Sequence, residues 1–270
     1  MIDGFFELSD AQALIRDTAR NYAQRALFPV AAKLDRERIF PGEQIAALAE
    51  LGLMGVNVPE EYGGAAAGVV AYAVAMMEIA QGCASTAVTM AVNNMVAETI
   101  VRFGSEEQKR KYVPEITSGR FQAAAFGLSE PHSGSDAAGM RTSARRDGRD
   151  WVLNGNKQWI TSGDRAGVIV VWARTGEPGS KGISCFLVEG GTKGLSVGRH
   201  EDKMGLRASS TVSLSFEDLR VPDSALMGGE GRGFAVAMSA LDGGRIGIAS
   251  QGVGIGSVAL AEAVRYAKDR

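Results

Sequence analysis

The chain has 270 residues, enough for one large domain or two ordinary ones. Apolar residues make up 45% and charged residues 22%, which is the composition of a folded globular protein and excludes wholesale disorder. Lysine and arginine number 29 against 31 acidic residues, and this balance lacks the basic footprint of a nucleic-acid-binding protein.

Two cysteines, Cys83 and Cys185, lie far apart in the chain without C-x-x-C spacing. This spacing excludes a disulfide scaffold and a structural zinc site, so we expect no metal and a reducing compartment. The N-terminus has neither the basic region nor the long apolar region of a signal peptide. We therefore expect a cytoplasmic protein, and a mature protein of the mitochondrial matrix remains the alternative.

Residues 1 to about 119 show the apolar spacing of helices. Ser9 and Gln12 form a capping box, S-x-x-Q, which predicts the start of the first helix. Pro29 and the pair Pro41-Gly42 are expected to mark the next connections.

Two segments, 69–80 and 85–103, are apolar on nearly every side, which predicts helices buried in a bundle. Glutamine, glycine and asparagine residues in and between them argue against a membrane span, which needs about 20 apolar residues. Ser105 and Gln108 repeat the capping box and predict a short helix that ends at Pro114.

From about residue 121 to residue 222, short β-like runs replace the helical spacing. Asn154-Gly155 is a strong signal for a two-residue hairpin turn. Continuous apolar runs at 168–172 and 183–188 indicate strands, and residues 211–217 alternate between apolar and polar. A compact antiparallel β domain follows from this pattern.

Helical spacing returns after Gly233, where small or apolar residues recur at intervals of three and four from Ile246 to Ala267. These residues form a seam that another element must cover, and the pattern continues to Arg270. We therefore expect an α+β multidomain chain. Its parts are a helical domain at residues 1–119, an antiparallel β domain at 120–226 and the first part of a second helical domain at 227–270.

Four segments resemble the signatures of the acyl-CoA dehydrogenase family, and they occur in the family's order over essentially the whole chain. They are Phe126-Gly-Leu-Ser-Glu-Pro-His-Ser-Gly-Ser-Asp136, Lys157-Gln-Trp-Ile-Thr161, Lys203-Met-Gly-Leu-Arg-Ala-Ser209 with Phe216-Glu-Asp-Leu-Arg-Val-Pro222, and Gly231-Arg-Gly-Phe234 with Leu241-Asp-Gly-Gly-Arg-Ile246. The sequences of residues 182–188 and 241–249 are most similar to those of the short-chain and short branched-chain members.

The resemblance implies an FAD-dependent oxidoreductase of fatty acid β-oxidation. Such a flavoprotein converts a short-chain acyl-CoA into the trans-2-enoyl-CoA and passes the electrons to electron-transfer flavoprotein. The implied fold has a helical N-terminal domain, a middle β domain that serves as the flavin platform, and a C-terminal four-helix bundle. The implied assembly is a homotetramer with no nucleic-acid partner and no membrane span.

The first two signatures contain the residues that the resemblance assigns to the flavin. The first contributes Phe126, Leu128, Ser129, Gly134 and Ser135, and the second contributes Trp159, Ile160 and Thr161. The indole of Trp159 is expected to stack on the flavin, and Thr161, two residues on, to project to the same side of the strand and bond near flavin N5. Taken singly, these residues also fit a Ser/Gly-rich loop, a core tryptophan and a strand threonine.

Asp242 and Arg245 are spaced i, i+3 and should share one helix face. The resemblance implies that both contact the CoA part of the substrate, and that Ser135 reaches its thioester end. The alternative is an ion pair on a helix surface. His132 stands where the family most often has glycine, and we expect a loop residue with an unusual backbone angle instead of a catalytic group.

No residue of the chain is assigned as the catalytic base. The resemblance places this glutamate beyond Arg270 in most members and at the position of Gly244 in a minority, and glycine cannot serve. We therefore expect a C-terminally incomplete enzyme, with residues 1–270 inactive by themselves. The alternatives are a short protein that binds flavin or acyl-CoA without dehydrogenating it, and a flavoenzyme similar to acyl-CoA oxidases.

Overall fold

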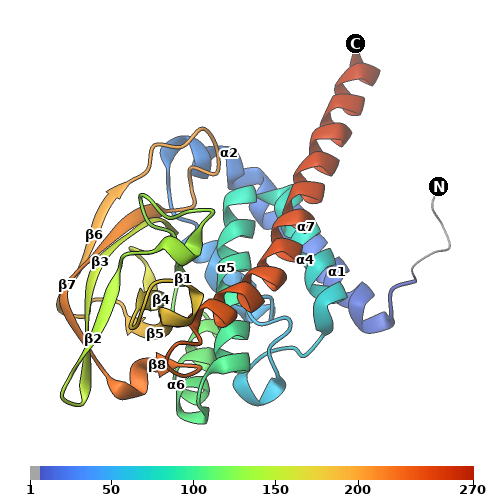
Figure 1. The fold of residues 1–270 in the computed structure, drawn as a ribbon. Coiled ribbons are helices and arrows are strands. Elements are labelled where there is room, and N and C mark those ends of the chain that lie inside the picture. The colour runs from blue at the N-terminus through green and yellow to red at the C-terminus, as the bar shows by residue number, and fades with distance from the viewer. Residues whose placement is uncertain (1–6) are drawn as a thin grey trace.

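The computed structural model describes residues 7–270. Helices pack on one side of the molecule and a sheet lies on the other, with the last helix crossing between them (Figure 1). The helices are α1 (Asp10–Tyr22), α2 (Phe28–Glu37), α3 (Gly42–Glu50), α4 (Gly68–Gly82), α5 (Ala84–Phe103), α6 (Glu106–Thr117) and α7 (Gly233–Asp269). The strands are β1 (Ala123–Gly127), β2 (Ser143–Asp147), β3 (Asp150–Thr161), β4 (Ala166–Arg174), β5 (Ile183–Glu189), β6 (Leu195–His200), β7 (Thr211–Pro222) and β8 (Leu226–Met227). The predicted order of helical domain, β domain and C-terminal helix is confirmed.

Both predicted capping boxes are present. The Ser9 hydroxyl accepts a hydrogen bond from the backbone N–H of Gln12, and the Gln12 side chain accepts one from the Ser9 N–H. The same reciprocal pair joins Ser105 and Gln108 at the start of α6. Each box satisfies two of the backbone donors that a helix start leaves unpaired, so short local sequence is enough to set these boundaries.

Pro29 does not mark a break between helices and Pro114 does not end one, contrary to the predictions. Pro29 is the second residue of α2, and a π-helical segment at Ala23–Leu27 joins α1 to α2 directly. The N–H of Phe28 bonds to the Ala23 carbonyl five residues back, so the wider turn carries the helix past the proline. Pro114 lies inside α6, which continues to Thr117. The helix closes beyond it because the Pro114 carbonyl accepts a bond from the Ser118 N–H at 3.1 Å.

Two asparagines in the apolar helix α5 connect the helices to their surroundings. The fully buried side chain of Asn94 accepts a bond from the Val56 N–H at 2.9 Å and donates to the Leu53 carbonyl at 2.9 Å. Asn93 accepts a bond from the N–H of Ala124 in β1 at 2.8 Å. These polar side chains therefore hold the loop after α3 on one side of α5 and the first strand on the other.

The strands form one sheet in the order β6-β7-β3-β2-β4-β5-β8, with β1 added along β4. Most neighbours are antiparallel, as predicted, and β7 buries Val212, Leu214 and Phe216 on one face. The sheet is nevertheless mixed, because β1 pairs with β4 in the parallel direction. A parallel pair needs a long crossover, and here the whole β2–β3 hairpin supplies it.

The hairpin turn predicted at Asn154-Gly155 is wrong, since β3 runs through this pair without a break. The turn between β2 and β3 lies at residues 148–149, where Asp147 pairs with Asp150. Gly155 instead marks an irregularity in the pairing with β7 and has a φ of 144°. A Cβ there would lie 2.6 Å from the Cα of Thr142, so the glycine permits a close backbone approach.

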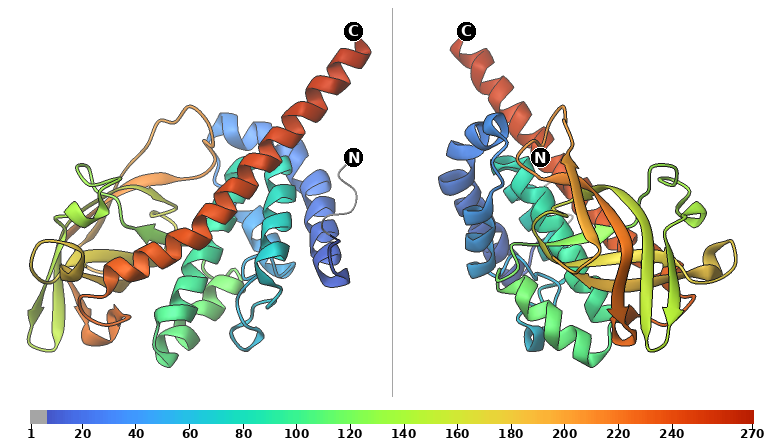
Figure 2. Two further views of the ribbon diagram at one scale, coloured as in Figure 1. Left: turned by 45° about the vertical axis from the view of Figure 1, so that its right-hand side comes forward. Right: turned by 90° about the vertical axis from the view of Figure 1, so that its left-hand side faces the viewer.

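Helix α7 leaves the sheet, crosses the N-terminal helices and projects beyond them (Figure 2). Gly247 lies against the Tyr72 hydroxyl and Gly254 against the Met77 carbonyl, so missing side chains let α7 approach α4 closely. The predicted apolar seam is uncovered within residues 7–270, with Val253 and Leu260 both exposed.

Helix α7 is also long and apolar enough to cross a membrane, judged by length and composition alone. This is weak evidence for a span, because the core helix of a soluble protein passes the same test.

We predict that Asn94→Ala lowers the free energy of unfolding by about 2–4 kcal/mol, because it leaves a buried N–H and a buried carbonyl without partners. Denaturant unfolding followed by circular dichroism measures this loss. Asn154→Ala is the matched control, since Asn154 also makes two hydrogen bonds, to Asp218, at an exposed site. Equal losses in the two variants would contradict the role given to Asn94.

Candidate functional site

A cavity of about 330 Å³ opens where β1, β3, α5 and α7 meet. Its lining residues are Val92, Met95, Phe126, Leu128, Ser129, Gly134, Trp159, Ile160, Thr161 and Leu241. All the residues that the sequence assigns to the flavin are among them except Ser135. An apolar wall with a few convergent polar groups is the usual character of a small-molecule site.

Trp159 forms an open wall of this cavity. Its side chain is 58% exposed, whereas Trp151 and Trp172 are buried. The backbone of Trp159 is left-handed, with a φ of 60°. A large side chain adopts this conformation only under local constraint.

A β-bulge produces this conformation. Lys157 pairs with Leu214 and Ile160 pairs with Val212, so β3 carries one residue more than β7 over this stretch. Trp159 and Thr161 both line the cavity, in agreement with the expectation that they project to the same side. The side chain of Ile160 between them is 2% exposed and packs in the core of the sheet with Val212.

The adjoining wall is the segment that follows β1. The N–H of Gln158, beside the bulge, donates to the Ser129 carbonyl at 2.9 Å and joins the two walls. Phe126 packs on the buried ring of Trp172, with the ring centroids 4.3 Å apart. No other heavy atom lies within 4 Å of a Cβ position at Gly134, so the backbone there is open to a ligand.

A buried ion pair lies directly beneath these walls. The Lys157 side chain is fully buried and its Nζ lies 2.9 Å from Glu130 Oε1 and 3.0 Å from the Leu128 carbonyl. Burial lowers the pKa of Lys157 to about 8, although Glu130 opposes the shift. Burial also disfavours the charge on Glu130, but Lys157 and bonds from Arg141 and Thr142 outweigh it and hold the pKa of this carboxyl below its ordinary value.

Several site residues escaped the sequence analysis. Val92 and Met95 lie in a segment that is apolar on every side, so no pattern separates a cavity face from a core face. Glu130 and Lys157 stand inside the recognised signatures, but their flanking residues are mostly polar, so nothing along the chain marks them as a buried pair. Leu241 begins the second half of the fourth signature, and the signature alone assigns it no role.

His132 does not line the cavity. Its Nε2 lies 3.5 Å from Glu130 Oε2. The expected unusual backbone angle is wrong, because His132 is not one of the residues with positive φ. It occupies a tight turn closed by bonds between the backbones of Glu130 and Ser133.

Asp242 and Arg245 do share a face of α7, one residue beyond the cavity wall at Leu241. Arg245 Nη1 lies 3.0 Å from Asp242 Oδ1, and both side chains are 72% exposed. An exposed ion pair of this kind contributes little to stability. Both side chains are therefore accessible to a ligand next to Leu241, although neither lines the cavity itself.

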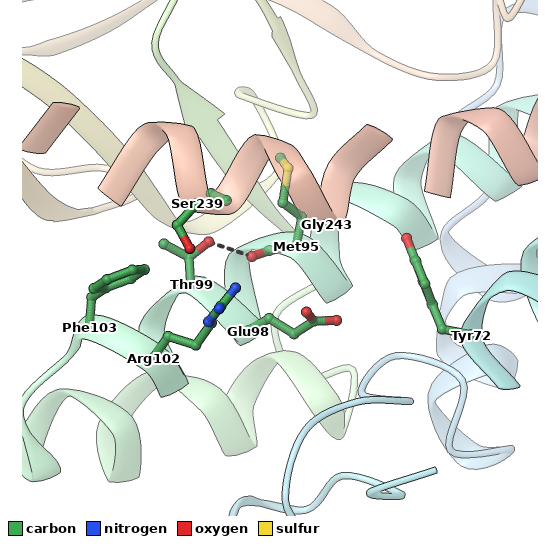
Figure 3. A pocket seen from close by; sticks show the side chains of 9 residues that line it. Tyr72, Met95, Glu98, Thr99, Arg102, Phe103, Ser239 and Gly243 are labelled. Carbon is green, nitrogen blue, oxygen red and sulfur yellow. Dashed lines mark hydrogen bonds between the residues drawn. The ribbon is translucent and has the colours of Figure 1, made fainter. Parts of the chain in front are cut away.

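A second, much smaller cavity lies behind Met95, which lines both (Figure 3). Its volume is about 10 Å³, about one water molecule. Glu98 and Arg102 project into it from α5, beneath α7. Burial raises the pKa of Glu98, although a bond from Asn57 and the charge of Arg102 oppose this. The Met95 side chain thus separates this carboxyl from the larger cavity.

Family models cover most of the chain. The model for the N-terminal domain of acyl-CoA dehydrogenases matches residues 9–120, that for the middle domain matches 125–219, and that for the C-terminal domain matches 231–270.

Individual relatives agree with this assignment. The chain is 50% identical over 266 residues to the mitochondrial short-chain specific acyl-CoA dehydrogenase of Bos taurus, covering 98% of the chain but 64% of that relative. The chain therefore spans less than two thirds of that relative's length. The acyl-CoA dehydrogenase of Bacillus subtilis is 43% identical, with 97% of the chain and 70% of the relative covered.

Solved structures of the same architecture superpose closely. Butyryl-CoA dehydrogenase from Megasphaera elsdenii has a TM-score of 0.95 at 39% identity, covering 99% of the chain and 71% of that structure. Glutaryl-CoA dehydrogenase from Mycobacterium smegmatis, solved with FADH2, has a TM-score of 0.91 at 35% identity, covering 97% and 67%. A chain in a structure described as the electron transferring flavoprotein of Acidaminococcus fermentans has a TM-score of 0.96 at 42% identity, covering 99% and 70%.

We predict that the titration of Lys157 makes the free energy of unfolding increase with pH in the alkaline range. Its pKa is lowered on folding from 10.5 to about 8, so the unfolded chain holds this proton more tightly and the free energy of unfolding rises with pH between these values. The difference between the wild type and Lys157→Met should therefore increase over this range, by at most about 1.4 kcal/mol per pH unit. Denaturant titrations at stepped pH measure it, and a flat or falling difference would contradict the assignment.

Proposed function

This chain belongs to the acyl-CoA dehydrogenase family, and we propose that it forms the flavin-binding part of a short-chain acyl-CoA dehydrogenase. The reaction removes hydrogen from the α and β carbons of a short-chain acyl-CoA and yields the trans-2-enoyl-CoA. FAD is the proposed cofactor and electron-transfer flavoprotein the proposed acceptor. The observation that carries the proposal is the cavity in which two separate signatures and the start of α7 meet around an exposed tryptophan.

The residues of the cavity fit a flavin ring. The exposed indole of Trp159 offers a flat apolar face for stacking, and the hydroxyls of Ser129 and Thr161 offer polar contacts to a ring edge. FAD, when bound, accepts the hydride that leaves the β carbon. The protein's own part is to hold the ring flat against Trp159, to keep water from its face and to present hydrogen-bond donors along its rim.

The base that removes the α proton is proposed to lie outside residues 1–270. No carboxylate lines the cavity within the part of the chain that the structure describes. Gly244 has no side chain, and a Cβ there would lie 2.8 Å from Met95 Sδ. Glu98 has the raised pKa that a base in a dry pocket needs, but Met95 stands between it and the cavity.

The substrate is proposed to enter beside α7. Asp242 and Arg245 lie one helical turn apart next to Leu241, and a guanidinium suits the phosphates and polar groups of CoA. Ser135 is proposed to contact the thioester end of the substrate and the rim of the flavin, as the family signature implies, although it does not line the cavity itself.

Assembly and location are also proposals. The exposed seam of α7, with Val253 and Leu260, provides an apolar surface for further helices of a four-helix bundle and for a homotetramer. We propose that α7 is a packed helix of the C-terminal domain and not a membrane span, because its glycines fit closely against α4. A cytoplasmic location, with a role in fatty acid β-oxidation, completes the proposal.

We predict that Trp159→Ala weakens FAD binding about 5- to 150-fold, because stacking on an aromatic side chain is worth about 1–3 kcal/mol. FAD titration followed by flavin absorbance and fluorescence measures the change. Trp159→Phe keeps a stacking face and serves as the control. Unchanged FAD retention in the alanine variant would argue against the stacking role.

We predict that Arg245→Ala raises the KM for butyryl-CoA about tenfold while FAD binding stays unchanged, because the lost contact lies on the CoA side of the cavity. Steady-state kinetics of the full-length enzyme with an artificial electron acceptor measure this, because residues 1–270 are expected to be inactive by themselves. Arg265→Ala is the matched control, since Arg265 also forms an exposed i, i+3 ion pair on α7 but lies far from the cavity mouth. A KM unaltered by Arg245→Ala would remove this residue from the substrate site.

A further inference from the structure

We propose that the buried pair Lys157–Glu130 is a positioning element that holds Trp159 and the segment 128–130 at the spacing required of two adjoining walls of the cavity. The identity of the ligand between those walls rests on the proposed function. The positioning itself is a property of the empty protein and can be tested without flavin.

The Lys157 ammonium joins the two walls. It donates to the Leu128 carbonyl at 3.0 Å and to Glu130 Oε1 at 2.9 Å. The next residue of β3, Gln158, donates its N–H to the carbonyl of Ser129 at 2.9 Å. Residues 128–130 of one wall are thus bonded to Lys157 and Gln158, the two residues of β3 that precede Trp159 in the other wall.

Glu130 closes the base of the loop that carries Gly134. Its Oε2 accepts a bond from the Arg141 N–H at 2.7 Å, and its Oε1 accepts one from the Thr142 N–H at 3.0 Å. The chain leaves the cavity wall at Glu130 and returns to the same carboxylate before β2 begins. Both ends of the loop are therefore fixed to Lys157 through one buried side chain.

The bulge needs such a restraint. A left-handed conformation at a non-glycine residue is strained, and Trp159 adopts it with a φ of 60°. On one side the chain is held by the buried Lys157 and the Gln158 bond, and on the other Ile160 returns to the ladder opposite Val212. With both neighbours held, the extra residue has room only on the cavity side, and its indole faces the cavity.

Packing alone does not account for a charged pair at this place. Removing two charges from water is costly, and a buried ion pair often adds no more stability than apolar side chains of similar volume. The pair instead orients the backbone, because its charge-assisted hydrogen bonds hold specific carbonyl and amide groups at defined angles. A methionine at position 157 would fill the same space and leave the Leu128 carbonyl and Glu130 without their donor.

The experiment compares Lys157→Met and Glu130→Gln with the wild type, first without flavin. Hydrogen exchange at the Gln158 amide reports the bond between the walls. Acrylamide quenching of fluorescence reports Trp159, because Trp151 and Trp172 are buried. We expect faster exchange at Gln158 and altered quenching in both variants, and FAD affinity lowered about 10–100-fold, the loss that removal of an outer-shell partner causes at other bound groups.

Glu78→Gln is the matched control. Glu78 is a buried carboxylate in a bidentate ion pair with Arg20, and this pair joins α1 to α4 away from the cavity. It should lower thermal stability without changing Gln158 exchange, Trp159 quenching or FAD affinity. If Gln158 exchange, Trp159 quenching and FAD affinity depended only on stability, they would change to the same extent in Lys157→Met, Glu130→Gln and Glu78→Gln. That result would overturn the proposal.

The remaining outcomes are distinct. If the variants keep wild-type Gln158 exchange and Trp159 quenching, the positioning role is wrong, whatever the ligand. If the wild type takes up no FAD while both readouts change as expected, the proposed function fails and the positioning element stands. Should Lys157→Met not fold, the nearly isosteric Glu130→Gln carries the same test.

Discussion

The charge pair between Lys157 and Glu130 sets the geometry on which the cavity depends. It lies where water is excluded, so each hydrogen bond to it is electrostatically strong and its loss would leave polar groups unsatisfied. Because Glu130 also accepts from the amides of residues 141 and 142, this contact organises three separate segments. The exposed Trp159 lies two residues from Lys157 on the same strand, so the geometry fixed by this buried pair bears directly on the position of its indole.

The helical part supplies the rest of the site. Asn93 on α5 bonds to β1, and two residues later Met95 lines the cavity, so one helix both anchors the sheet and forms a wall. Helix α7 reaches the opposite side because glycines let it approach α4 and α5 closely. The result is a site at the contact of helices and sheet, where neither part alone encloses a volume.

Local signals in the sequence were sufficient wherever neighbouring residues decide the outcome. The capping boxes at Ser9 and Ser105 and the alternation in β7 needed nothing from the rest of the chain. Pro29, Pro114 and the Asn154-Gly155 pair misled because their local preference is weak against the surrounding structure. A helix can take up a proline beside a π-helical segment, and a glycine serves a close approach as well as a turn.

By itself the sequence determined the order of helical and β parts, the family, and most of the residues that surround the cavity, because these depend on local pattern and on signatures read in order. Only the tertiary structure decided how those residues meet. The bulge that turns Trp159 outward, the closure of the loop on Glu130, and the place of Met95 between two cavities all arise from contacts between distant segments. Patterns along the chain report only local periodicity. They could not reveal the direction of a side chain at a bulge, or the pairing of Lys157 with Glu130, 27 residues away.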